Sequence, residues 1–192
     1  MIGLYTKNFE DVWFGVACDD KKIFATSFSS SQINVLHGLL ANIPFNIPFQ
    51  QPAEFSSFAE QALDLMKDVY DGKGAGQTLP LSMEHLSNYA ERVLEAVALI
   101  PVGYVSSYGA VAKAVGGSPR AVGRVMATNP FPPLVPCHRV VASDFSLGGY
   151  SGGLRAKLEF LKREKRGFIE KMEIPAKKKR LQVYPVEYVL NK

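Results

Sequence analysis

The spacing of apolar residues divides the chain into a first half with strands and helices and a second half dominated by helices. Two largely apolar runs, Val12–Cys18 and Ile23–Phe28, flank turn-forming residues and predict a β-hairpin. A helix from the capping residue Ser31 to about Ala41 should follow, and a second one over Glu54–Tyr70. The residues expected on the apolar faces of these two helices are Ile33, Leu36, Leu39, Leu40, Phe58, Ala62, Leu65 and Met66.

The second half begins after Gly72–Pro80, a segment with three glycines, one proline and no apolar periodicity. Ser87 is placed to cap a helix over Asn88–Leu99, whose buried stripe should contain Tyr89, Val93, Leu94 and Val97. Two short alanine-rich helices are predicted within Ser106–Pro130, separated by a glycine-containing turn. The pattern is that of a helix-turn-helix, with Ser118 as the cap and Pro119 as the first residue of its second helix.

These elements predict an α/β (α+β) fold with two domains. The first domain, residues 1–71, contains strands and helices, and residues 72–86 form a linker. The second domain, residues 87–168, is mainly helical and contains the helix-turn-helix. Residues 169–192 are expected to form a basic C-terminal extension.

Charge is distributed unequally between the two halves. Residues 1–85 carry five lysines and no arginine against ten acidic residues, a net charge of −5, whereas residues 86–192 have a net charge of +9. A basic second half favours a polyanionic partner for that half alone. The alternative is a solvated basic surface, because part of the excess lies in the cluster Lys177–Arg180.

Cysteine content and the N-terminal sequence indicate the cellular compartment of the protein. Two cysteines cannot form a disulfide framework, and no cysteine or histidine spacing is typical of a metal site. The N-terminal residues include acids and lack the cationic leader of a signal peptide, and no apolar run is long enough to span a bilayer. We therefore expect an intracellular, cytoplasmic protein (nuclear in a eukaryotic source) with no metal and no membrane contact.

The second helix of the helix-turn-helix has an unusual composition. It presents Arg120 and Arg124, while Ala121, Gly123 and Ala127 are small enough to let its backbone approach another surface. Arg120 lies in the first turn, where the helix dipole disfavours a cation. This position favours an anionic or π-rich partner, although packing against the domain core would also explain the glycine.

A lone thiol, Cys137, lies beside His138 within an apolar run. Thiolates are the reactive form of cysteine, and a nearby base activates them. Neighbouring side chains of a strand point to opposite faces, so either the chain turns at Pro136 or a water molecule links His138 to the thiol. The alternative is a buried structural cysteine, which is how we interpret Cys18.

A glycine-rich segment, Leu147–Gly153, follows the thiol and contains Tyr150. It lacks the spacing and the lysine of a phosphate-binding P-loop. Its glycines would let the backbone approach a flat ligand closely, and the alternative is a mobile surface loop. A helix over about Leu154–Lys165 is expected next, with Glu164 near its end.

Taken in order, these motifs resemble those of the O6-alkylguanine-DNA alkyltransferases, also called methylated-DNA–protein-cysteine methyltransferases. The resemblance covers roughly Ser87–Phe168, and its most specific part is Pro136–Val140. The other matching motifs are Ser107–Gly109, Ser118–Gly123, Asn129–Pro130, the loop Gly148–Gly153 and Glu164. It implies a ribonuclease-H-like N-terminal domain and a winged-helix-like C-terminal domain, and the tail after Phe168 is longer than expected for this family.

The resemblance also implies roles for individual residues. Cys137 would accept the alkyl group, His138 would deprotonate it through a water molecule, and Glu164 would orient the histidine. Asn129 would brace the turn around the site. The residues implied in contacting the extruded base are Tyr108, Val140, Tyr150 and Ser151. Arg120 would fill the gap left in the duplex, with Ala121, Gly123, Arg124 and Ala127 along the minor groove.

The implied activity is that of a suicide methylated-DNA–protein-cysteine S-methyltransferase. The expected partner is double-stranded DNA containing O6-alkylguanine, or in addition O4-alkylthymine, bound by a monomer without a cofactor. A thioether has no carbonyl for water to attack, so each molecule should react once. Two other hypotheses stay open, a non-catalytic binder of alkylated DNA and a cysteine hydrolase with His37 or His85 as base.

Overall fold

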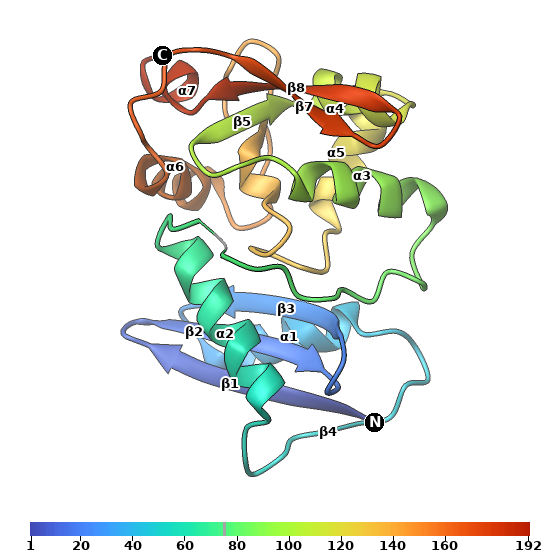
Figure 1. Cartoon of the computed structure of the whole chain (residues 1–192). Coiled ribbons are helices and arrows are strands. Elements are labelled where there is room, and N and C mark those ends of the chain that lie inside the picture. The colour runs from blue at the N-terminus through green and yellow to red at the C-terminus, as the bar shows by residue number, and fades with distance from the viewer. Residues whose placement is uncertain (75) are drawn as a thin grey trace. The chain divides into compact units, whose positions relative to one another are not determined.

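The computed structural model describes residues 1–74 and 76–192, which form two compact units. The first unit contains Met1–Tyr70, residues 76–85 and Pro130–Leu134, and the second contains Asp71–Gly74, Leu86–Asn129 and Val135–Lys192. The expected linker, residues 72–86, includes residue 75, which lies outside the described residues. The α/β class expected from the sequence is confirmed, with strands and helices in both units (Figure 1).

The first unit is a four-stranded sheet with a helix on each face (Figure 1). Strands β1 (Ile2–Phe9), β2 (Val12–Cys18) and β3 (Ile23–Ser29) are antiparallel, and the short β4 (Phe49–Gln50) pairs parallel to β1. The predicted hairpin is therefore confirmed, as β2 and β3. Helix α1 (Gln32–Asn42) packs on one face of the sheet, and α2 (Ser57–Tyr70) packs on the other.

Two details of these helices differ from the sequence prediction. Helix α1 buries Val35 and Leu39, whereas Ile33 is 64% exposed. Gly15 of β2 explains this rotation, because a Cβ there would lie 2.3 Å from Val35 Cγ1, so only glycine lets the helix approach. Helix α2 begins three residues later than predicted, because the Ser56 hydroxyl accepts a hydrogen bond from the Ala59 N–H and caps it there.

The second unit contains the predicted helix-turn-helix. Helix α3 (Asn88–Ala98) is capped by Ser87, and α4 (Tyr108–Val115) and α5 (Pro119–Ala127) form the motif. Ser118 accepts a hydrogen bond from the Ala121 N–H at 3.2 Å, with Pro119 as the first helical residue, so both expected positions are confirmed. Helix α6 (Leu154–Arg163) begins at Leu154 as predicted and ends with Glu164 as its C-cap residue.

A second four-stranded sheet, which the sequence did not predict, holds the second unit together. Its order is β6 (Val140–Val141), β5 (Tyr104–Ser107), β8 (Lys179–Pro185) and β7 (Met172–Ala176). The tail beyond residue 168 therefore does not extend away from the unit. It forms the β7–β8 hairpin, pairs with β5, and ends in helix α7 (Glu187–Leu190), whose buried Val189 joins Val105, Val141 and Leu161 in a core cluster.

The basic cluster Lys177–Arg180 lies at the turn of this hairpin, and three of its four residues have protein partners. Lys177 pairs with Glu95 of α3, Arg180 pairs with Glu173 at 3.2 Å, and the Lys179 ammonium donates to the Lys113 carbonyl in the last turn of α4. A cation at that end of a helix is favoured by the helix dipole. These contacts give the cluster a structural role within the second unit.

Candidate active site

Cys137 is the first residue of a tight 3-10 turn. Residues Cys137–Arg139 form one turn, closed by a hydrogen bond from the Arg139 N–H to the Pro136 carbonyl at 2.9 Å. The sharp turn, one of the two sequence-based alternatives, is thus what the chain adopts. The Asn129 side-chain amide donates to the Val135 carbonyl at 2.9 Å and so fixes the backbone that enters the turn.

The buried carboxylate of Glu164 contacts both residues that follow Cys137 in sequence, His138 and Arg139. Glu164 Oε1 lies 2.8 Å from His138 Nε2, and Arg139 donates to both carboxylate oxygens, at 2.9 Å from Nε to Oε2 and 2.8 Å from Nη2 to Oε1. Arg139 also donates to the Ile100 carbonyl at 2.6 Å, and the His138 ring stacks on Phe160 with centroids 4.4 Å apart. The histidine ring is therefore fixed on one edge and one face.

The protonation of this group follows from its surroundings. Burial raises the pKa of Glu164, but the charges and hydrogen bonds of His138 and Arg139 outweigh burial and hold the pKa well below its usual range. The carboxylate only accepts hydrogen bonds, so His138 Nε2 carries a proton. Burial lowers the pKa of His138, which leaves the ring neutral with Nδ1 as a free acceptor. Among the described residues, none hydrogen-bonds this buried Nδ1 atom.

The thiol itself is protonated at rest. Burial raises the pKa of Cys137, while a hydrogen bond from Asn129, the charge of Lys157 and a hydrogen bond from Tyr150 oppose the rise. A thiol with a raised pKa reacts slowly unless a base removes its proton. The neutral imidazole next in sequence is such a base.

Lys157 supplies a buried positive charge beside the thiol. Its ammonium donates to the carbonyls of Val140 at 2.6 Å, Leu147, and Gly149 at 3.1 Å, and its side chain is fully buried. Burial lowers the pKa of Lys157 to about 8, although the charge of Cys137 opposes this. The ammonium thus ties the glycine-rich loop to β6 and lowers the cost of a thiolate at Cys137.

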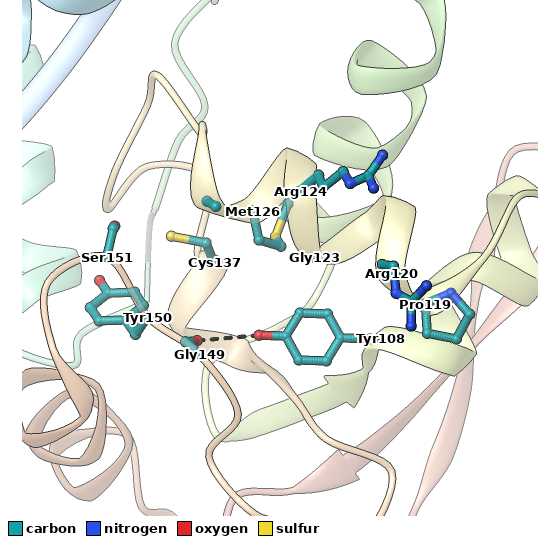
Figure 2. Close-up of a pocket in the computed structure, with 11 residues that line it drawn as sticks. Tyr108, Pro119, Arg120, Gly123, Arg124, Met126, Cys137, Gly149, Tyr150 and Ser151 are labelled. Carbon is teal, nitrogen blue, oxygen red and sulfur yellow. Dashed lines mark hydrogen bonds between the residues drawn. The ribbon is translucent and has the colours of Figure 1, made fainter.

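A pocket of about 640 Å³ opens above the thiol (Figure 2). Helix α5 lines it with Arg120, Gly123, Arg124 and Ala127, and the loop opposite contributes Gly149, Tyr150 and Ser151. Figure 2 shows the Cys137 sulfur directed toward the side of the pocket that carries Tyr150 and Ser151, while the Arg124 side chain extends away from it.

Tyr108 closes one side of this pocket. Its hydroxyl donates to the Gly149 carbonyl at 3.2 Å, and burial, followed by the nearby charge of Cys137, raises its pKa, so the phenol keeps its proton. Gly148 has a φ of 66°, and a Cβ there would lie 3.0 Å from Tyr108 Cε2. Glycine at this position lets the loop lie directly against the tyrosine ring.

The structure brings most of the sequence-predicted residues together but separates a few from the pocket. His138, Glu164 and Asn129 are not among the residues that line the pocket, and Ala121 lies half-buried on α5 outside the lining. Val140 makes two backbone hydrogen bonds within the protein, because its carbonyl accepts from Lys157 and its N–H donates to the Cys137 carbonyl. Its backbone is therefore already engaged.

Comparison with known proteins agrees with this geometry. The family model of the 6-O-methylguanine DNA methyltransferase DNA-binding domain matches residues 88–166. The chain is 40% identical to the methylated-DNA–protein-cysteine methyltransferase of Methanocaldococcus jannaschii over 112 residues, 58% of this chain and 66% of the relative. The chain belongs to the O6-methylguanine-DNA methyltransferase family. This confirms the resemblance drawn from the motifs.

Two further methyltransferases define the extent of the similarity. The enzyme named methylated-DNA–protein-cysteine methyltransferase in Pyrobaculum aerophilum is 58% identical over 62 residues, 32% of this chain and 42% of the relative. The alignments thus cover less than two thirds of these curated relatives. The crystal structure of the O6-methylguanine-DNA methyltransferase from Pyrococcus kodakaraensis is 29% identical, with a TM-score of 0.65, and covers 85% of this chain and 99% of that one.

Two features of this site were not predicted from the sequence, the burial of Lys157 and the ion pair of Arg139 with Glu164. The signal for Lys157 was present, since the buried positions of α6 and its cap repeat at helical spacing. They are Lys157, Phe160, Leu161 and Glu164. A lysine and a glutamate at positions of the apolar stripe indicate buried charges with partners.

Within the described residues, no group of three or more His, Cys, Asp or Glu side chains is placed to hold a metal ion. In that same part of the chain, no helix is both long enough and apolar enough to cross a bilayer. Cys18, the other thiol, is buried in the first unit, and burial, reinforced by the charges of Asp19 and Asp20, raises its pKa to about 12. Its interpretation as a core residue agrees with this burial.

Proposed function

We propose that this protein repairs DNA by transferring the alkyl group of O6-alkylguanine to Cys137. The observation that carries the proposal is a thiol that lines a pocket and is followed in sequence by a neutral histidine, whose ring is oriented by Glu164. A stacked base cannot reach such a thiol, so the nucleotide must leave the duplex and enter the pocket. Family membership supports the same reaction.

The transfer step follows from the protonation states. A water molecule bound to His138 Nδ1 takes the Cys137 proton and passes its own to the imidazole, and the resulting imidazolium is stabilised by Glu164. The thiolate attacks the alkyl carbon, the C–S bond forms, and the C–O6 bond breaks with its electron pair going to the guanine. Tyr108, protonated at neutral pH, and Ser151 would stabilise the charge developing on the base, which then takes up a proton.

Helix α5 is the proposed DNA-contacting element. Arg120 and Arg124 are exposed on it, and Gly123 and Ala127 line the same pocket. We place this helix in the minor groove, with Arg120 entering the duplex where the base has left. The N-cap Ser118 fixes the start of the helix and hence the direction of Arg120.

The proposal is tested by incubating the protein with a duplex that contains one O6-methylguanine. Intact-mass measurement should detect a gain of one CH2 group per protein molecule, and peptide mapping should place it on Cys137 and not on Cys18. The amount of repaired DNA should not exceed the amount of protein. Repair of several lesions by one molecule would contradict a stable thioether, and tight binding without any mass change would favour a non-catalytic binder.

Replacing Arg120 with alanine should slow repair of the duplex about 10- to 100-fold, because the cost of unstacking a base is then not offset. Reaction with an O6-alkylguanine free base should change less than about twofold, since no duplex has to be opened. Single-turnover rates with both substrates measure this difference. The matched control is Arg155→Ala, an exposed arginine of α6. Equal losses on both substrates would disprove the duplex role of Arg120.

A further inference from the structure

The C-terminal segment lies against the loop that forms one side of the pocket. This loop leaves β6 at Val141 and reaches Tyr150 and Ser151 of the pocket lining. Lys157 holds it on the pocket side, through the carbonyls of Leu147 and Gly149. Phe145 and Asp144 of the same loop contact residues 184–192, which lie beyond residue 166, where the match to the family model ends.

Phe145, the central aromatic residue of the loop, is held between two tyrosines of that segment. Its ring lies edge-on to Tyr184, with centroids 5.0 Å apart, and to Tyr188, with centroids 5.3 Å apart. Edge-to-face pairs of this kind are stabilising beyond their buried area. Phe145 and Leu147 also pack on the core cluster to which Val186 and Val189 contribute.

The backbone of the loop needs such support. Phe145 has a φ of 64°, in the left-handed region that bulky residues rarely adopt. A conformation of this kind persists where the surroundings hold it in place. The neighbouring Asp144 accepts hydrogen bonds from Ser146, and its side chain pairs with the Lys192 ammonium at 3.1 Å. Ring packing and an ion pair thus fix two consecutive residues of the turn.

We propose that the C-terminal segment Tyr184–Lys192 positions the loop that binds the extruded base. Tyr188 and Lys192 are the positioning residues that act through Phe145 and Asp144. The identity of the ligand rests on the proposed function. The contacts between the segment and the loop are independent of it. Figure 1 shows α7 and the C-terminus at the end of the second unit.

The test replaces Tyr188 with alanine and, separately, with phenylalanine. Alanine removes the ring contact with Phe145, whereas phenylalanine keeps it. The concentration of O6-alkylguanine free base that gives half-maximal single-turnover transfer should rise about five- to tenfold in Tyr188→Ala, with the maximal rate changed less than about twofold. Tyr188→Phe should restore the wild-type value. Amide hydrogen exchange of residues 147–150 should be faster in the alanine variant alone.

Tyr104→Ala is the matched control, because Tyr104 stacks on Phe168 in the same unit, at a centroid distance of 5.0 Å, in a ring pair that does not include Phe145. Equal effects of Tyr188→Ala and Tyr104→Ala would overturn the proposal. Lys192→Met is a second variant, at an exposed position where the substitution should not impair folding. Unchanged amide exchange of residues 147–150 in both Lys192→Met and Tyr188→Ala would also overturn the proposal. A wild-type protein without transfer activity would refute the proposed function. The hydrogen-exchange experiment would still test the positioning of the loop, because it needs no substrate.

Discussion

Glu164→Gln is expected to slow alkyl transfer about 10²- to 10⁴-fold, on duplex and free base alike. The glutamine keeps the shape of the side chain but removes the charge that holds the Nε2 proton of His138 and stabilises the imidazolium. Its amide can also donate to Nε2, which would put the proton on Nδ1 and leave no acceptor for the water molecule. Single-turnover kinetics with both substrates measures the loss.

The same substitution leaves the Arg139 guanidinium buried without its counter-ion, which we expect to lower the free energy of unfolding by about 3–5 kcal/mol. Affinity for a lesion-free duplex, which depends on α5, should stay within about threefold and shows that the variant is folded. Glu159→Gln, a half-buried position of the same helix outside the site, is the matched control. A transfer rate close to that of the wild type would refute the relay through His138.

Lys157→Met should have the second-largest effect, a slowing of about 10²-fold at neutral pH. Methionine has a similar length but no charge, so the thiolate loses the favourable charge of Lys157 and the pKa of Cys137 rises further. The pH at which transfer reaches half its maximal rate should therefore shift upward. The carbonyls of Val140, Leu147 and Gly149 also lose the hydrogen bond from Lys157, which loosens the glycine-rich loop.

The pH profile distinguishes these two effects of Lys157. Burial puts the pKa of Lys157 at about 8, so the wild type itself loses the ammonium as the pH rises through that value. The electrostatic part of the difference between wild type and variant should therefore shrink above about pH 8. Single-turnover rates between about pH 6 and pH 9 measure this, with Lys162→Met on the exposed side of α6 as control. Identical profile midpoints would show that the ammonium does not act on the thiol.

Local sequence signals were sufficient for the helices around the site and for the identity of its thiol. The serine caps at positions 87 and 118, and Pro119, act through neighbouring backbone groups, so their roles are evident from the sequence. The motif Pro136–Val140 likewise located the turn. The sequence left open whether the chain turns at Pro136 or a water molecule links His138 to the thiol. The Pro136 carbonyl accepts a hydrogen bond from the Arg139 N–H, so the chain turns there.

Features that depend on distant partners could not be predicted in the same way. Strand β8 pairs Pro185 with Tyr104, residues far apart in sequence whose register no local pattern contains. Lys157 was missed because a lysine on a helix is usually solvated, and only its three carbonyl acceptors show why this one is buried. The rotation of α1 depended on a glycine in a neighbouring strand.

Helix α6 and its C-cap residue carry two charges of the site, Lys157 and Glu164, seven residues apart on one stripe. Each residue added to a helix turns whatever follows by about 100°. An insertion or deletion between the two would therefore swing the carboxylate out of the histidine's reach while leaving the ammonium in place. Natural variants of this chain should accordingly tolerate length changes in surface loops far better than within this one segment.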